Sequence, residues 1–378
     1  MLVTYGRAYY RAQVTVLIVL FWISLAALAW THVLYPAFAA LLARVAPRRL
    51  HKDDIEPSVT VVVAAYNEES VIGRRIENLL ELDYPADKLR IVVSSDASSD
   101  RTEEIALQYP GVQVISNPRG GKVAAQDRAV RQTDGEIVAF SDANATWSPD
   151  ALRKLVRAFA DPDVAYVCGQ LRILDAEGGN KEGVYWRYEM VQRSAESQLG
   201  SVTGGNGSIY AVRRSEYVEV DPRFGHDLSL PYLMVQRGSR AVYEPEAQAW
   251  EKPTPSNETE YRRKVRMFEH CWLILLRGRM FRRLGPVYFL EIVSHRLLRY
   301  GSGILHVVLL VTSLALYSHG WFYAVVLAGQ LGLLAAAAIG VGIARYYVLV
   351  SWATLVALLN YLRRGVPATW EVAEGTRA

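Results

Sequence analysis

The stretch Glu136-Ile-Val-Ala-Phe-Ser-Asp-Ala-Asn-Ala145 decides the fold. Its apolar run, residues 137–140, is typical of a buried strand in a parallel sheet. The run leads directly into Asp142 and Asn144, at the end of the strand where doubly wound sheets bind their ligands. Two oxygen ligands there suit Mg²⁺ or Mn²⁺ shared with a phosphate. A strand followed by an ordinary turn explains the same residues equally well, so the rest of the chain must decide.

The composition indicates a membrane protein with a soluble domain. The 378 residues carry a net charge of only +4, which does not favour nucleic acid as a partner. Hydrophobic residues make up 51% of the chain, and the excess is concentrated at its two ends. The only two cysteines, Cys168 and Cys271, lie far apart in apolar surroundings. This excludes a disulfide framework or a cysteine-based zinc site and fits a reducing compartment.

Apolar segments at both ends are predicted to be membrane helices. They are residues 14–30 with 33–43, then 304–317, 322–343 and 346–362. The first is long enough to span a bilayer, and the basic residues after it place the amino terminus outside and the next domain in the cytoplasm. Three later spans would leave the tail outside, whereas Arg363 and Arg364 favour the inside. Either one segment is re-entrant or interfacial, or the charge rule fails.

Between the membrane segments, short apolar runs alternate with amphipathic helices. Strands are predicted at 59–65, 89–93, 112–116, 137–140 and 164–169, and helices at 68–80, 102–109, 123–132 and 150–160. This order, without hairpin signals, predicts a parallel sheet of nucleotide-binding type. We divide the chain into an N-terminal transmembrane helix (1–45), a cytoplasmic α/β domain (46–266), amphipathic interfacial helices (267–300), C-terminal transmembrane helices (301–365) and a tail (366–378).

Candidate binding residues stand at the carboxyl end of each of the first four predicted strands. They are Ala65-Tyr66-Asn67-Glu68, then Asp96, then Gly121-Lys122, then Asp142 with Asn144. Each has an ordinary explanation as a cap or turn, but their joint placement at one edge of a sheet is what a nucleotide site requires. Asp96 can bind a base, Lys122 can reach a diphosphate, and Asp142 with Asn144 can hold the bridging metal. Gly204-Gly205-Asn206-Gly207 does not open a helix after a first strand, so it is no dinucleotide fingerprint.

These residues resemble membrane-bound family 2 glycosyltransferases, the group of cellulose, chitin and hyaluronan synthases and of bacterial exopolysaccharide and Nod-factor enzymes. The resemblance implies an α/β GT-A (Rossmann-like) domain with α-helical transmembrane segments, a UDP-sugar donor, and Mg²⁺ or Mn²⁺. Asn67-Glu68 is similar to the family's first-strand motif, residues 95–100 to its base-binding motif, and Gly121-Lys122 to its G-K loop. Asp142-Ala143-Asn144 stands where the family has its D-x-D metal motif, with an amide in place of the second carboxylate.

Two later motifs extend the resemblance. The segment 225–231 is similar to the family's E-D-x-x-L sequence, which makes Asp227 the general base. His226 replaces the usual acid there and receives no role. Arg263 and Arg266 occupy the place of the Q-x-x-R-W motif and can clamp the departing diphosphate. Met267 replaces the tryptophan of that motif, which leaves processive synthesis and single addition both open.

The resulting hypothesis is an inverting, metal-dependent hexosyltransferase of the bacterial inner membrane, with its catalytic domain in the cytoplasm. Its partners are a nucleotide sugar, a polysaccharide or lipid-linked acceptor and membrane lipids, and no nucleic acid. Single addition to a glycolipid is an alternative within the same chemistry. A catalytically degenerate nucleotide- or metal-sensing membrane protein, favoured by His226 and Asn144, is the alternative of another class. The aromatic cluster at 185–189 is either a sugar-binding platform or a buried helix anchor.

Overall fold

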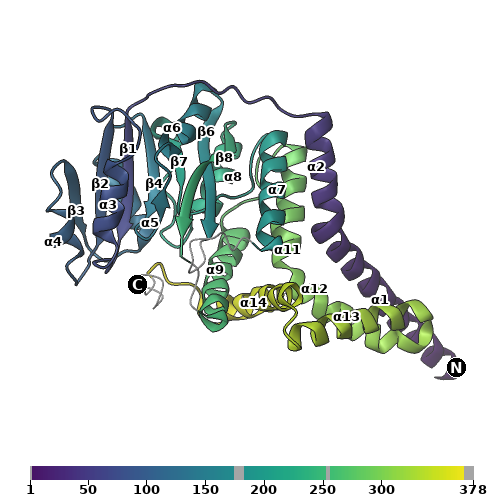
Figure 1. Ribbon diagram of the computed structural model, residues 1–378. Helices are drawn as coiled ribbons and strands as arrows, with labels where there is room; N and C mark the ends of the chain where they lie inside the picture. The colour runs from purple at the N-terminus through teal and green to yellow at the C-terminus, as the bar shows by residue number, and fades with distance from the viewer. Residues whose placement is uncertain (1, 174–182, 253–255, 370–378) are drawn as a thin grey trace.

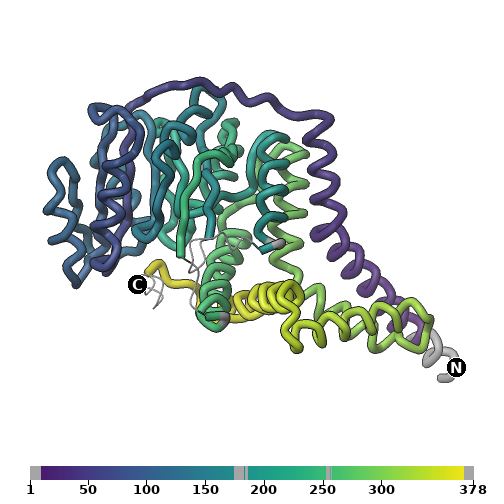
Figure 2. The backbone as a smooth tube through the Cα atoms, viewed as in Figure 1, coloured from purple at the N-terminus to yellow at the C-terminus, as the bar shows by residue number. Residues whose placement is uncertain are grey.

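The computed structural model describes residues 2–173, 183–252 and 256–369, which form an α/β domain joined to a set of long helices (Figure 1). The chain path in Figure 2 leaves the long N-terminal helix, crosses the top of the domain and enters the sheet. It then returns through the helices of the second half. The last described residues come back to the sheet, because the backbone of Ala368 packs directly against Gly121.

An eight-stranded mixed sheet forms the centre of the domain, in the order β3-β2-β1-β4-β7-β6-β8-β5. Its strands are β1 (Val59–Ala65), β2 (Leu89–Asp96), β3 (Val112–Asn117), β4 (Ile137–Asp142), β5 (Thr146–Trp147), β6 (Val164–Ile173), β7 (Tyr210–Arg213) and β8 (Arg240–Glu251). Strands β3, β2, β1 and β4 are parallel, as predicted. The other half is mixed: β7 runs antiparallel to both β4 and β6, and β5 antiparallel to β8. A fully parallel sheet was therefore a wrong prediction, because β7 lies where the alternating pattern has ended.

Both faces of the sheet are covered by helices. Side chains of β1 alternate, so that Val61 and Val63 pack with α3 (Ile72–Leu80) and α6 (Ala151–Val156). Val62 points the other way, into the cluster that includes residues of α5 (Lys122–Arg131), α7 (Val184–Leu199) and α8 (His226–Gln236). Burial of one such side chain contributes about 1.5–3 kcal/mol. Two-sided burial explains why these strands appear as unbroken apolar runs in the sequence.

Two helices are shorter than the sequence predicts. Helix α3 begins at Ile72 and not at Glu68, because Asn67 has a positive φ of 54° and the Glu68 amide donates to Thr102 Oγ1 at 2.8 Å. Helix α4 (Thr102–Ala106) ends before the predicted Tyr109, since Pro110 disfavours helical geometry in the residue that precedes it.

Four helices of the described chain are long and apolar enough to cross a membrane: Tyr10–Val45, Ser302–His319, Trp321–Ala338 and Gly342–Arg364. The first contains α1 (Leu2–Ala29), a π-helical turn η1 (Trp30–Leu34) and α2 (Tyr35–Val45); the others contain α12 (Ser302–Leu316), α13 (Trp321–Ala338) and α14 (Gly342–Arg364). Side-chain contacts align the first apolar helix with the second at both ends: His32 Nε2 of η1 lies 3.0 Å from Ser302 Oγ, and Tyr10 Oη lies 3.4 Å from Nε2 of His319, in the turn after α12.

Helix α14 is placed differently from the other three. Its Tyr347 hydroxyl contacts His306 Nε2 at 2.8 Å, in the second turn of α12, and its later residues pack on α9 (Asn257–Arg277). Trp272 of α9 donates to the Thr354 carbonyl at 2.9 Å, and Arg364 pairs with Glu269 at 3.0 Å. The carboxyl end of α14 therefore lies beside the α/β domain, on the side where α12 begins.

The predicted interfacial segment, residues 267–300, contains buried ionic contacts. Its second half forms α10 (Pro286–Glu291), the π-helical η4 (Ile292–Leu297) and α11 (Leu298–Tyr300). Arg299 and His295 pair with Glu189 of α7, and the Arg299 guanidinium lies over the Tyr188 ring at 5.1 Å. Within the 185–189 cluster, Tyr188 and Glu189 thus join α7 to η4 and α11. Contact of residues 267–300 with a membrane surface stays a prediction.

The crossing of α12 and α14 predicts a sharp steric limit at Gly303. A Cβ there would overlap the Ser351 carbonyl oxygen and lie 2.9 Å from Leu355 Cβ. We expect Gly303→Ala to destabilise the protein by about 1–3 kcal/mol through overpacking, seen as a lower midpoint of thermal unfolding in detergent. Gly332→Ala in α13 is the matched control, because its Cβ meets nothing within 4 Å. Equal unfolding midpoints for the two variants would contradict this packing.

Candidate active site

The parallel half of the sheet brings the predicted site residues to one edge. Register pairs Ala65 with Ser95, Asp96 with Asn117, and Ala64 with Asp142. The four loops that follow these strands therefore begin at the same level. The sequence predicted this convergence from the order of the elements alone.

The loop after β1 is tied to the loop after β2. Asn67 adopts its positive φ and accepts a hydrogen bond from the Ser99 amide at 2.8 Å, while its own amide donates to Ser98 Oγ at 3.1 Å. Glu68 is buried behind it. These contacts give Asn67 a structural role; contact of Tyr66, Asn67 and Glu68 with a nucleotide stays a prediction.

Asp96 anchors the glycine loop after β3. Its carboxylate is buried and accepts the amides of Gly120 and Gly121 at 2.7 and 2.8 Å, and it pairs with Arg119 at 2.5 Å. The Arg119 guanidinium lies over the Tyr66 ring, 3.3 Å from its centroid. Gly121 has φ of 92°, which a residue with a Cβ rarely adopts. Asp96 thus sets the position of Lys122, the first residue of α5.

Lys122 lies within a cluster of carboxylates at the edge of the sheet. Its ammonium pairs with Asp142 Oδ1, and the Ser208 hydroxyl lies between Asp142 Oδ2, at 3.4 Å, and Glu251 Oε1. Burial by itself would lower the pKa of the Lys122 ammonium. The charges of Asp142, Asp227 and Glu251 outweigh burial, so this pKa lies above its usual value.

A glycine-rich loop closes this cluster. A Cβ on Gly207 would be 3.1 Å from Lys122 Nζ and 3.4 Å from Asp142 Oδ2, and one on Gly205 would overlap the Tyr166 hydroxyl. Asn206 holds the loop by donating to the Gly169 carbonyl at 2.7 Å and accepting the Ser208 amide at 3.1 Å. Only small residues allow the backbone to approach the charged groups this closely.

The donor set at this edge fits a hard divalent cation, because it consists of carboxylate, hydroxyl and amide oxygens next to a position already filled by an ammonium group. Asn144 lies in the turn between β4 and β5, half-buried. Nothing within the described chain hydrogen-bonds to its amide, so its role as a ligand stays a prediction. No group of three or more His, Cys, Asp or Glu suited to a metal occurs among the described residues.

Asp227 carries a half-buried carboxylate in the first turn of α8. A Cβ on Gly225 would lie 2.5 Å from its Oδ1, so glycine at 225 leaves room for the carboxylate. Within the described residues no donor hydrogen-bonds to that carboxylate. Its charge helps to raise the pKa of Lys122, which connects it electrostatically with Asp142 and Glu251. An unpaired carboxylate in this position can accept a proton.

His226 points away from the site. Its side chain is buried, its Nδ1 lies 2.9 Å from the Tyr210 hydroxyl, and its Nε2 lies 3.3 Å from the Tyr217 hydroxyl and 3.7 Å from Asp127 Oδ1. The ring packs edge-on against Phe140. This histidine is part of the core beneath α8, which supplies the role that the sequence left unassigned.

Arg263 and Arg266 lie one turn apart on α9. Arg263 pairs with Glu260 at 2.9 Å and is half-buried. Burial lowers its pKa, but Glu260 and Glu251 together raise it above the usual value. The structure therefore brings Arg263 within the electrostatic range of the carboxylate cluster, and Arg266 follows on the same helix. Their contact with a diphosphate stays a prediction.

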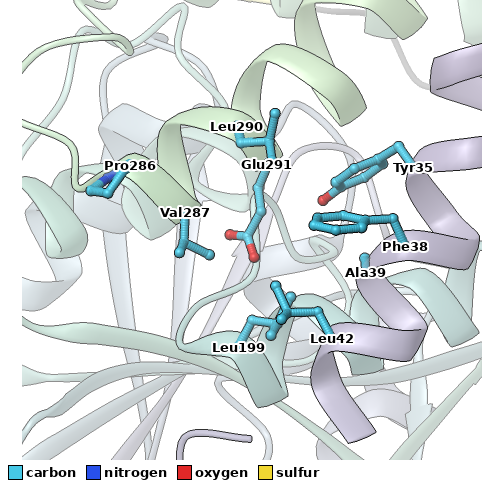
Figure 3. A pocket seen from close by; sticks show the side chains of 9 residues that line it. All are labelled: Tyr35, Phe38, Ala39, Leu42, Leu199, Pro286, Val287, Leu290 and Glu291. Carbon is cyan, nitrogen blue, oxygen red and sulfur yellow. The ribbon is translucent and has the colours of Figure 1, made fainter. Parts of the chain in front are cut away.

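One cavity of about 220 Å³ lies elsewhere in the described chain, between α2, α10 and the end of α7 (Figure 3). Its walls are mostly apolar, and its polar groups are the Glu291 carboxyl group and the Tyr35 hydroxyl group. None of the predicted site residues lines it. The strand-end cluster and this cavity are thus separate features of the molecule.

The sequence analysis missed Glu251, Ser208 and the loop at 204–207 as parts of the site. Glu251 is the last residue of β8. One of the two strands that pair with β8 is β5, which begins two residues after Asn144. A run of glycines was the only signal for the loop. Position in the sheet brings these residues to Asp142, and no local pattern encodes that position.

Comparison with known proteins agrees with this arrangement. Residues 60–220 match the family described as Glycosyl transferase family 2. The chain is 34% identical over 163 residues to a beta-monoglucosyldiacylglycerol synthase of Synechocystis, covering 40% of this chain and 33% of that protein. It is 29% identical over 224 residues to an N-acetylglucosaminyltransferase of Rhizobium, covering 51% and 48%. The alignments thus span about a third to a half of these curated relatives.

A solved structure extends the likeness in fold. The mannosyltransferase PcManGT of Pyrobaculum calidifontis, in complex with GDP-Man and Mn²⁺, superposes with a TM-score of 0.72 at 24% identity. The superposition covers 91% of this chain and 99% of that one. It confirms the predicted GT-A fold joined to apolar helices. Residues 60–220 of this chain are a domain of glycosyl transferase family 2.

Proposed function

We propose that this protein transfers a sugar, with inversion, from a nucleoside diphosphate sugar to a polysaccharide or lipid-linked acceptor at the cytoplasmic membrane face. One observation carries the proposal. The unpaired Asp227 carboxylate and the Lys122–Asp142 cluster lie together at the edge where four strand-end loops converge. Membership of residues 60–220 in a glycosyltransferase family supports the same reaction class.

The donor is held by groups of two kinds. The loops at 65–68 and 96–100 bind the base and ribose, with Asp96 accepting from the base. Lys122 and Arg263, with Arg266, bind the diphosphate through charge-assisted hydrogen bonds. Asp142 and Asn144 would hold Mg²⁺ or Mn²⁺, which would supply electrostatic stabilisation of the diphosphate leaving group. UDP is the expected nucleotide, while the structural neighbour contains GDP-Man.

Asp227 activates the acceptor. The acceptor oxygen forms a bond to the anomeric carbon while the bond from that carbon to the diphosphate oxygen breaks, and the electron pair leaves with the diphosphate. The hydroxyl proton moves to Asp227. A single in-line displacement inverts the anomeric configuration.

Two classes of acceptor fit the proposed reaction: a growing polysaccharide and a lipid-linked sugar. Met267, in the place of the family tryptophan, is 37% exposed on α9. The relatives named above are a glycolipid synthase and an N-acetylglucosaminyltransferase. Single addition to a lipid-linked acceptor is the alternative to polymer synthesis, and product sizing separates the two.

We also propose a membrane topology with three crossings. The first helix brings the chain to the cytoplasm, α12 leads out, and α13 leads back. Two contacts support it: Tyr10 meets His319 at the outer ends, and Arg364 meets Glu269 of the catalytic side. Helix α14 is then an interfacial helix that packs on α9, and the charge of Arg363 and Arg364 agrees with the positive-inside rule.

Asp227→Asn tests the assignment of the base. We expect loss of transfer by at least about 10²-fold, which general base catalysis typically contributes. Binding of UDP or GDP should stay unchanged, since the amide keeps the size of the side chain. The measurement is nucleotide release over a panel of UDP- and GDP-sugars with Mn²⁺, next to calorimetric nucleotide binding.

Asp221→Asn is the control. The Asp221 carboxylate pairs with Arg223 at 2.6 Å, and Lys122 is not among the groups that shift its pKa. This variant should retain full transfer. If the wild-type protein binds nucleotide but transfers and hydrolyses no donor of the panel, the enzyme proposal fails in favour of a nucleotide-sensing protein.

Cysteine labelling tests the topology. Cys168 and Cys271 are both buried, so a new exposed cysteine reports alone. In intact cells, a membrane-impermeant maleimide should label Ser318→Cys, in the exposed turn between α12 and α13, and should not label Arg363→Cys until the cells are lysed. Labelling of Arg363→Cys in intact cells would mean that α14 crosses the membrane.

A further inference from the structure

Glu251 is a half-buried acid for which the proposed reaction so far has no use. It ends β8, and the antiparallel pairs Thr146–Trp250 and Trp147–Ala249 place it beside the turn that contains Asn144. Its Oε1 accepts from Ser208 Oγ, which also lies 3.4 Å from Asp142 Oδ2. Two carboxylates therefore face each other across one hydroxyl group.

Positive charges also lie around this pair. The ammonium of Lys122 pairs with Asp142, and the guanidinium groups of Arg75 and Arg263 act on Asp142 and Glu251, respectively. The two carboxylates and the hydroxyl between them are oxygen donors of the kind that a hard divalent cation binds.

The local backbone also favours an ion at this position. Gly207 has no side chain, and a Cβ there would lie 3.1 Å from Lys122 Nζ and 3.4 Å from Asp142 Oδ2. Glycine therefore leaves space for both groups. Glu251 places a carboxylate, from another strand of the same sheet, beside the turn in which position 144 carries an amide.

We propose that Glu251 is a ligand of the divalent cation, paired with Asp142 across Ser208, and that Asn144 is the weaker contributor. This inference rests on the proposed function for the diphosphate that shares the cation. Ser208 positions both carboxylates by donating to one of them at a time. Lys122, which holds Asp142 in the present structure, is released toward the diphosphate when the cation binds.

The test is Mn²⁺ binding to the full-length protein in detergent, measured by calorimetry and by the electron paramagnetic resonance signal of free Mn²⁺. Titrations use MnCl₂ with whichever of UDP and GDP the wild-type protein binds. We expect Glu251→Gln to weaken Mn²⁺ binding by at least about 10-fold, the scale on which ligand-shell changes act. Nucleotide binding without metal should be unchanged, and Asn144→Ala should weaken Mn²⁺ binding less.

Glu246→Gln is the matched control, because this carboxylate lies on the same strand but is exposed and pairs with Arg157 at 2.9 Å. It should bind Mn²⁺ as the wild type does. If Glu251→Gln fails to fold, Ser208→Ala replaces it: removal of the bridging hydroxyl leaves both carboxylates and should also weaken Mn²⁺ binding.

Wild-type Mn²⁺ affinity in Glu251→Gln, together with lost affinity in Asp142→Asn, would overturn the inference while leaving the proposed transfer intact. So would a larger loss in Asn144→Ala than in Glu251→Gln. Failure of the proposed function has a different signature: the wild-type protein then transfers no sugar, whatever its metal binding. The two failures are therefore distinguishable.

Discussion

Asp142, Asp227 and Glu251 act on one ammonium group, that of Lys122, at the edge of a largely buried sheet. Charges removed from water must be paired, and an unpaired buried carboxylate costs several kcal/mol. The cluster therefore favours cations: Lys122 pairs with Asp142, and Arg75 and Arg263 act on Asp142 and Glu251. Two features hold Lys122 in this position. Asp96 accepts hydrogen bonds from the amides of the two preceding glycines, and Gly207 has no side chain that would crowd the ammonium group.

A second set of buried polar contacts joins this edge to the membrane helices. Tyr35 of α2 donates to Glu196 Oε1 at 2.9 Å, and Glu196 Oε2 accepts from the Thr203 hydroxyl at 2.9 Å. Arg296 donates to the same hydroxyl at 3.0 Å. Thr203 directly precedes the glycine loop that closes the carboxylate cluster. Buried hydrogen bonds thus join the first membrane segment to the residue that precedes the glycine loop of the site.

Two π-helical turns lie beside this connection and contact each other. In η1, Thr31 donates to the Ser294 carbonyl at 2.6 Å and Trp30 donates to Ser294 Oγ at 2.8 Å. Ser294 belongs to η4, so the two irregular turns face each other. A π-helical turn frees carbonyl groups from the helical ladder, and here one of them accepts a side chain of the opposite helix. Pro36, two residues after η1, is a sequence signal for the first turn, because it has no N–H to donate to the His32 carbonyl. The residues of η4 include neither proline nor glycine.

Local patterns determined much of this protein. The bounds of β1, the four strand-end motifs and the apolar helices all follow from periodicity and composition, because each depends on residues that are neighbours in sequence. The tertiary structure alone decided the direction of β7, the burial of His226 in the core, the return of α14 to the catalytic side, and the approach of Glu251 to Asp142. These depend on pairing between distant segments, since a strand's neighbours and a buried charge's partners are chosen by packing and not by the residues next to them.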